Sequence, residues 1–247
     1  MSKDCGAGRR SNAGCGRKPD GKYTKRRRGG CSGGWNLRGK VSVRSIKSGQ
    51  LQQNKPSLKN LSLRVEQIRR ENPTAEVRLW SQDEARFGLQ PILKRRWAKK
   101  GVRPAAEINP QYEWTWSYAA VEMATGESFF LILPNLQASS VEIFLSEFAA
   151  AQGLSTEKIA VLLWDGAPAH RAQLKVPVGV ELVSTPAYTP ELNPSERLWS
   201  PLRETVANRW FDGVEQMEEV LINGIRDLSK QKEYLSNLTN YDWLPQT

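Results

Sequence analysis

Three segments of this 247-residue chain place acidic side chains at the edges of otherwise apolar elements. The three side chains are Asp83, Asp165 and Glu196. An isolated carboxylate in such a position is costly unless a cation compensates its charge. Ligand sets made only of oxygen suit a hard divalent ion such as magnesium or manganese. The fold is therefore expected to bring three distant segments together around such an ion.

The spacing of apolar residues predicts an α/β fold with one mixed sheet and helices on its faces. The expected elements are a helix over 58–70, strands over 76–83, 114–123, 128–133, 159–164 and 180–183, a helix around 141–148 capped by Ser139 and Ser140, and a long helix from 196 to 210. Residues 124–127 are expected to form a hairpin turn, and residues 87–98 are expected to pair with the hairpin strands.

The acidic residues have definite positions in these elements. Alternation over 76–83 puts Asp83 at the end of an inward-facing row of one strand. The unbroken apolar run 159–164 is typical of a strand covered on both faces, and Asp165 ends it. Glu196 falls in the first turn of the last helix, on the same side as Trp199. Taken singly, each carboxylate has an ordinary alternative as a turn former or a helix-cap partner.

Three carboxylates on separate rigid elements can hold two metal ions about 3.5 to 4 Å apart. Such a pair makes a water or hydroxyl nucleophilic and stabilises a leaving oxygen. The sequence therefore indicates a metal-dependent enzyme that acts on phosphates.

The positive charge is concentrated near the N-terminus. Residues 1–60 hold 16 Lys and Arg against 2 Asp and Glu, whereas the remainder holds 20 against 24. A cationic arm of this kind is typical of a polyanion binder, with nucleic acid as the first candidate. A disordered tail without a partner is the alternative.

The same arm holds 11 of the 19 glycines in its first 50 residues and all three cysteines. It shows neither helical nor strand periodicity, so residues 1–55 are expected to be disordered. The cysteine spacing favours neither a zinc site nor a disulfide framework. Without an apolar run long enough for a membrane span, the protein is expected to be cytoplasmic.

Three motifs resemble the acidic blocks of the DDE transposases of bacterial insertion sequences, in the IS six-thirty branch related to the Tc and mariner elements. The motifs are Gln82-Asp83-Glu84-Ala85-Arg86-Phe87, Trp164-Asp165-Gly166-Ala167-Pro168-Ala169-His170 and Tyr188-Thr189-Pro190-Glu191-Leu192-Asn193-Pro194-Ser195-Glu196-Arg197-Leu198-Trp199. The resemblance runs from about residue 56 to about residue 221.

The resemblance implies a ribonuclease H-like fold over residues 56–247, with Asp83, Asp165 and Glu196 as a catalytic triad that binds two Mg²⁺ ions, for which Mn²⁺ can substitute. The implied reaction is cleavage at transposon ends followed by attack of the freed 3′ hydroxyl on target DNA. It further implies double-stranded DNA as partner, a homodimer on that DNA and association with the nucleoid. Family members usually carry helix-turn-helix modules, and residues 1–55 show no such pattern. We therefore expect the arm to come from a truncated or frame-shifted reading of a longer element whose DNA-binding half is encoded separately.

Two further groups are candidate functional residues. The densest basic patch of the domain is predicted to grip the DNA backbone, and it consists of Lys94, Arg95, Arg96, Lys99 and Lys100. A charged edge that only prevents aggregation is the alternative. His170 is a candidate accessory residue that orients water or phosphate, with helix capping or packing as the alternative. For the whole chain, the alternatives to a transposase are a catalytically idle DNA-binding remnant and another ribonuclease H-like nuclease.

Overall fold

The computed structural model describes residues 55–95, 97–101, 105, 107, 109–165, 173–185, 189, 192–242 and 244, with side chains from residue 61 onward. Residues 1–54 of the predicted arm lie outside this range, as do Arg96 and His170. Among the described helices, none is long and apolar enough to cross a membrane.

Five strands form one mixed sheet in the order β3-β2-β1-β4-β5. The strands are β1 (Glu76–Gly88), β2 (Trp114–Glu122), β3 (Ser128–Leu133), β4 (Lys158–Trp164) and β5 (Val180–Ser184). The first three are antiparallel to one another, and β4 and β5 run parallel to β1. This is the strand order of the ribonuclease H-like fold, so the predicted fold class is confirmed.

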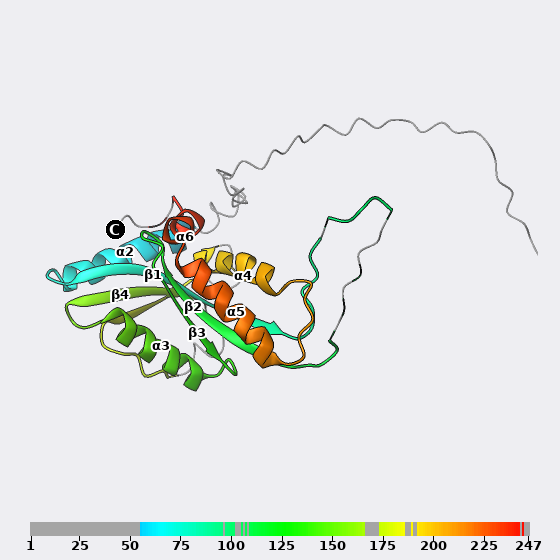
Figure 1. Ribbon diagram of the computed structural model, residues 1–247. Coiled ribbons are helices and arrows are strands. Elements are labelled where there is room, and N and C mark those ends of the chain that lie inside the picture. Colours follow the sequence, from blue (N-terminus) through cyan, green and yellow to red (C-terminus); the bar gives the residue numbers. More distant parts are fainter. Residues whose placement is uncertain are drawn as a thin grey trace, which may run out of the picture. The chain divides into compact units, whose positions relative to one another are not determined.

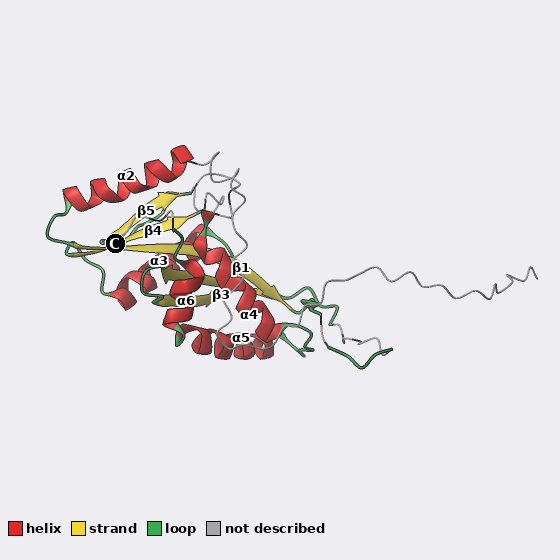
Figure 2. Cartoon of the chain, turned by 90° about the horizontal axis from the view of Figure 1, so that it is seen from above, coloured by secondary structure: helices red, strands yellow, loops and turns green. Residues whose placement is uncertain are grey.

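Helices cover both faces of the sheet (Figures 1 and 2). They are α2 (Lys55–Glu71), α3 (Ala138–Gln152), α4 (Trp199–Val206), α5 (Val214–Ser229) and α6 (Lys232–Thr239). A short 3₁₀ helix, η3 (Pro194–Leu198), precedes α4. Helix α3 packs its aromatic residues against Trp80 and Tyr118 on one face. Helices α2, α4, α5 and α6 pack on the opposite face.

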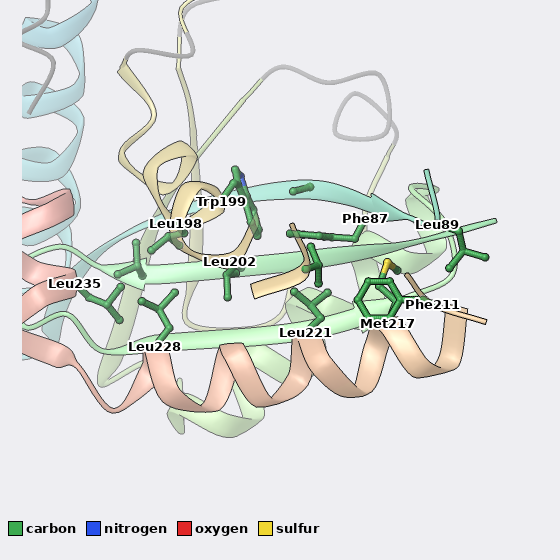
Figure 3. Close-up of a cluster of buried hydrophobic side chains, with 14 residues drawn as sticks. Phe87, Leu89, Leu198, Trp199, Leu202, Phe211, Met217, Leu221, Leu228 and Leu235 are labelled. Atoms are coloured by element: carbon green, nitrogen blue, oxygen red, sulfur yellow. The ribbon is translucent and has the colours of Figure 1, made fainter. Parts of the chain in front are cut away.

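The face opposite α3 carries two separate apolar clusters because side chains alternate along β1. Toward the start of β1, Leu79 packs with helix α2 and strand β4. Toward its end, Ala85 and Phe87 pack with helices α4 and α5, as Figure 3 shows for Phe87. Between them, Ser81 and Asp83 are buried but polar. The polar interval between the two clusters is where η3 meets the sheet.

Strand β1 is longer than the sequence predicted. Asp83 was expected to end the strand, but β1 continues to Gly88 because β2 pairs with it along that whole length. Only the pairing with β4 stops early, at Ser81. The expected pairing of residues 87–98 with the hairpin strands holds for Phe87 and Gly88, and the Leu89 N–H still donates to the carbonyl oxygen of Glu113 at 3.1 Å. It is wrong for the described residues from 90 to 98, which form a loop (Figure 1). Pro91 lacks the N–H group that a continued ladder requires.

Two helix predictions also need correction. The long helix expected over 196–210 is divided into η3 and α4, and α4 ends at Val206. Asn208 then adopts a left-handed backbone with φ 53°, which turns the chain and leaves Trp210 45% exposed. The predicted serine caps of α3 are wrong, because the cap position is Gln137 and Ser140 instead donates to Asn135 Oδ1.

The predicted β2–β3 hairpin is confirmed, and α6 docks tightly on its turn. Ser236 Oγ donates to the carbonyl oxygens of Met123 and Ala124 at 3.1 and 2.9 Å. Gly126 has φ 72°, and a Cβ atom there would lie 1.9 Å from the carbonyl oxygen of Lys232. The close approach of α6 to the hairpin therefore requires glycine at position 126.

We predict that Gly126→Ala destabilises the protein much more than Gly153→Ala. Gly153 has a similar φ of 60°, but nothing lies within 4 Å of its added Cβ. Gly153→Ala therefore measures the cost of the backbone strain without a steric clash. The free energy of unfolding should fall by about 1 kcal/mol in Gly153→Ala and by at least about 3 kcal/mol in Gly126→Ala, because the second substitution also displaces α6. Urea denaturation of both variants measures the difference. Equal losses would show that the hairpin accommodates a Cβ without moving α6.

Candidate active site

Asp83 lies on β1 and Asp165 directly follows the adjacent parallel strand β4. The last pair in the register of β1 and β4 is Ser81 with Leu163. Asp83 and Asp165 each lie two residues beyond that pair, and a separation of two residues keeps the side chains on one face. Neighbouring strands lie about 4.8 Å apart. The two aspartates therefore both follow the end of the β1–β4 ladder, at the same edge of the sheet.

Helix η3 is fixed to β1 beside these aspartates by a buried polar cluster. Ser81 Oγ donates to Asn193 Oδ1 at 2.6 Å, and Ser195 Oγ donates to Ser81 Oγ at 2.7 Å. Asn193 Nδ2 donates to the carbonyl oxygen of Gln82 at 2.9 Å, just past the last β1–β4 pair. Asn193 thus satisfies a backbone group that β4 no longer reaches. As N-cap of η3, it also accepts from the backbone N–H of Ser195.

Two more contacts hold the element that carries Glu196. Trp199 Nε1 donates to Asp83 Oδ2 at 2.6 Å, and both side chains are buried. On the other side, Arg197 donates to the carbonyl oxygen of Leu238 in α6 at 3.1 Å and lies over the ring of Tyr241. Glu196 itself is exposed. The acidic side chain therefore projects from an element that is anchored on both sides.

The electrostatics of the three carboxylates are coupled. Burial raises the pKa of Asp83 well above its usual range, the charge of Glu196 raises it further, and the Trp199 hydrogen bond opposes both. Loss of hydration raises the pKa of Glu196; Arg203 opposes this shift and Asp165 adds to it. The site thus concentrates negative charge that its own residues compensate only in part.

The donor set fits a hard divalent cation. All three candidate ligands are carboxylates, and the buried charge of Asp83 would be stabilised by a cation. Within the part of the chain that the structure describes, however, no three Asp, Glu, His or Cys side chains form a ready metal-binding group. The two-metal centre therefore remains a prediction, with Asp83, Asp165 and Glu196 as the residues that would hold the ions.

The remaining candidate residues differ in their surroundings. Lys94 forms an ion pair with Glu204 of α4, and its backbone N–H donates to Asn208 Oδ1. Arg95, Lys99 and Lys100 are exposed in the loop after β1, where Trp97 is 99% exposed. None of these residues takes part in the contacts that link β1 to η3. Arg96 and His170 lie outside the described residues, so their predicted roles remain predictions.

Sequence reasoning missed the residues that hold η3 on β1. Asn193-Pro194 is a helix-start signal, since asparagine caps and proline suits the first position. That signal would have placed a helix start next to Glu196. Ser81 was recognised only as part of an inward row, and Trp199 only as core. Their polar contacts span more than 110 residues of sequence, and no local pattern predicts them.

A family model described as DDE superfamily endonuclease matches residues 78–218, which is more than half of the chain and includes Asp83, Asp165 and Glu196. The chain belongs to this family. The resemblance seen in the three acidic motifs is therefore confirmed at the level of the DDE endonucleases.

Individual relatives of this DDE endonuclease are distant. It is 32% identical over 100 residues to the uncharacterized protein y4pE/y4sA of Sinorhizobium fredii, covering 40% of this chain and 73% of that protein. It is similar to the Mos1 transposase in a paired-end complex with the left transposon end, at 18% identity and a TM-score of 0.47, over 79% of this chain and 64% of that one. It is also similar to the mariner Mos1 paired-end complex with Mg, at 18% identity and a TM-score of 0.49, over 80% of this chain and 64% of that one. The chain thus spans slightly less than two thirds of the Mos1 chain.

We predict that Asp83→Asn stabilises the metal-free protein at neutral pH. Asparagine keeps the shape and an acceptor for Trp199 but removes the buried charge. Because the folded-state pKa of Asp83 lies above the unfolded-state value, the stability from this group is complete below about pH 4 and is lost as the pH rises through the folded-state pKa. At pH 7 the free energy of unfolding of the variant should be at least about 1 kcal/mol higher than that of the wild type, which corresponds to roughly 2–4 °C in Tm.

Thermal unfolding in EDTA from pH 4 to pH 7 measures this gain. Asp242→Asn, at an exposed position, is the control and should change little across the same range. A stability difference between Asp83→Asn and the wild type that shrinks toward pH 7 would contradict the prediction.

Proposed function

We propose that residues 56–247 form the catalytic domain of a DNA transposase that cuts transposon ends and joins them to target DNA. The observation that carries the proposal lies within the region that matches the DDE endonuclease model. There, Asp83 and Asp165 both lie just beyond the end of the β1–β4 ladder, and the charge of Glu196 acts on Asp83 as the charge of Asp165 acts on Glu196. The basic arm of residues 1–55 belongs to the same proposal as a DNA-binding segment.

In this proposal Asp83, Asp165 and Glu196 hold two Mg²⁺ or Mn²⁺ ions. When bound, such ions lower the pKa of water, polarise the phosphate and stabilise the leaving oxygen. The Mos1 complexes solved with Mn and with Mg support this choice of ions. The polar cluster of Ser81, Asn193 and Ser195 contributes by holding Glu196 in place relative to the two aspartates. Rigid placement of this kind reduces the reorganisation that the reaction would otherwise require.

Two phosphoryl transfers follow one another in the proposed reaction. In the first, a water oxygen attacks a phosphorus atom at the transposon end, and the 3′ oxygen leaves with a proton as a hydroxyl. In the second, that 3′ hydroxyl loses its proton and attacks a target phosphorus atom, and the target 3′ oxygen leaves. Because two transposon ends have to be joined, we also propose that the protein acts as a homodimer on DNA, as the paired-end organisation of Mos1 suggests.

The test is cleavage of supercoiled DNA that carries the terminal repeats flanking the coding region. With Mg²⁺, the full chain should release fragments cut at the repeat ends. Asp165→Ala should reduce the rate by roughly 10³-fold or more, because loss of a ligand removes several kcal/mol of charge stabilisation. DNA binding should stay within about twofold of the wild type. Asp227→Ala, an exposed position on α5, is the matched control and should cleave normally.

Other results would identify the alternatives. Nicking that is indifferent to the repeats would indicate a different ribonuclease H-like nuclease. Binding without cleavage would indicate a catalytically idle remnant. Unimpaired cleavage by Asp165→Ala would remove that residue from the proposed triad.

We further propose that the loop after β1 contacts the DNA backbone through Lys94, Arg95, Arg96, Lys99 and Lys100. The exposure of Arg95, Lys99 and Lys100 supports this assignment, as does the fully exposed ring of Trp97 among them. An exposed aromatic ring beside cations suits contact with nucleic acid. Lys94 contributes less in this proposal, because Glu204 already neutralises part of its charge.

We predict that the triple variant Arg95→Ala/Lys99→Ala/Lys100→Ala flattens the salt dependence of DNA binding. Each lost phosphate contact should reduce the slope of log K against log salt concentration by about 0.9. The expected total reduction is therefore about 2 to 3. Arg70→Ala/Arg226→Ala/Lys230→Ala removes the same charge from exposed positions in α2, in α5 and at the C-cap of α5, and serves as the control. Equal slopes for the two triple variants would mean that the loop cations act only through net charge.

A further inference from the structure

We propose that Trp199 is a positioning residue for the metal ligands: its indole N–H fixes the carboxylate of Asp83 and ties it to the element that carries Glu196. This inference rests on the proposed function. It adds a residue that makes no contact with DNA or metal and acts through Asp83.

The hydrogen bond between Trp199 and Asp83 is short and buried, and only Trp199 can be its donor. Trp199 Nε1 lies 2.6 Å from Asp83 Oδ2, and the two residues are 1% and 6% exposed. An indole nitrogen donates one proton and accepts none, so the carboxylate has to be the acceptor. A buried indole N–H without a partner would cost about 1 to 3 kcal/mol, which favours this single arrangement.

The orientation of the indole is itself fixed by packing. The ring meets Phe87 edge to face, with centroids 6.3 Å apart and an interplanar angle of 68°. Figure 3 shows Trp199 close to Leu198 and Leu202 in the cluster beneath α4 and α5. A ring held this way offers its N–H in one direction only. The Asp83 side chain, which otherwise rotates about two bonds, is therefore held in one orientation.

The bond still leaves room for a cation at Asp83. A carboxylate has about four lone-pair positions. Trp199 takes one on Oδ2, and the backbone N–H of Glu84 donates to the same carboxylate. About half of the acceptor capacity remains for metal coordination. Hydrogen bonds to the outer side of a ligand are the usual means by which proteins orient carboxylate ligands.

Trp199 also links two of the three proposed ligands to each other. It lies three residues after Glu196, where η3 continues into α4. The same turn is bonded to β1 through Ser195 and Ser81. Asp83 is therefore held by the same segment that supplies Glu196, and the Trp199 bond is the contact that acts directly on the Asp83 carboxylate. Loss of the indole N–H should loosen the metal site before it affects the rest of the fold.

The experiment compares two variants of the full chain. Trp199→Phe removes the N–H but keeps an aromatic ring, whereas Leu228→Ala creates a cavity elsewhere in the same apolar cluster and leaves the ring and its N–H in place. If Trp199→Phe does not fold, site-specific replacement of Trp199 by benzothienylalanine, in which sulfur replaces the N–H, keeps the shape of the side chain. Binding of Mn²⁺ is measured by electron paramagnetic resonance of the free ion, and cleavage is measured as a function of Mg²⁺ concentration.

We expect the variant without the N–H to bind Mn²⁺ about 10- to 100-fold more weakly, the usual effect of removing a ligand's hydrogen-bond partner. The Mg²⁺ concentration for half-maximal cleavage should rise by a similar factor. Leu228→Ala should stay within about threefold of the wild type in both measurements, although its Tm falls.

The outcomes separate this inference from the proposed function. Unchanged Mn²⁺ affinity without the N–H would overturn the positioning role even if the wild type cleaves DNA. Equal weakening in Leu228→Ala would overturn it too, because a general loss of stability would then explain the effect. A wild type that binds no Mn²⁺ would also overturn it. Selective weakening in a protein that never cleaves DNA would support the role of Trp199 and count against the transposase proposal.

Discussion

The organisation of this domain depends on the unequal pairing of the two edges of β1. Its ladder with β2 runs to Gly88, whereas its ladder with β4 stops at Ser81. Beyond that point one edge of a central, buried strand has backbone groups that no strand satisfies. Asn193 supplies the missing partner at the carbonyl of Gln82, and η3 follows it onto the sheet. The position of Glu196 beside the aspartates is therefore a consequence of where one parallel ladder ends.

Local patterns in the sequence were sufficient to locate the five strands. The alternation over 76–83 and the unbroken apolar run 159–164 correspond to β1 and β4, because both patterns report the burial of each strand face directly. The convergence of Asp83 and Asp165 then follows from the rule that parallel strands end at one edge. The approach of Glu196 had no such local basis. It came from the family resemblance, because the contacts that hold η3 join residues more than 110 positions apart.

The errors in the prediction have physical reasons as well. Strand β1 was cut short at Asp83 because a buried carboxylate usually marks the end of a strand, whereas β2 pairing carries the strand through it. The last helix was extended to residue 210, but it ends at Val206 and the left-handed turn at Asn208 follows. Helices α5 and α6 were not predicted. Their packing against the hairpin and η3 is visible only once the sheet is formed.

The buried polar residues Ser81 and Asp83 on β1 lower the stability of the fold, and core packing gives no reason for them. Leu79 and Phe87 belong to separate apolar clusters, and apolar residues at positions 81 and 83 would join these clusters into one. With Ser81 and Asp83 buried there, the hydrophobic stabilisation of a continuous core is lost. The buried polar atoms of both residues also need hydrogen-bond partners. Asn193, Ser195 and Trp199 provide those partners, all from one short segment. The proposed active site accounts for this arrangement, because stability is commonly given up where a fold positions a functional carboxylate.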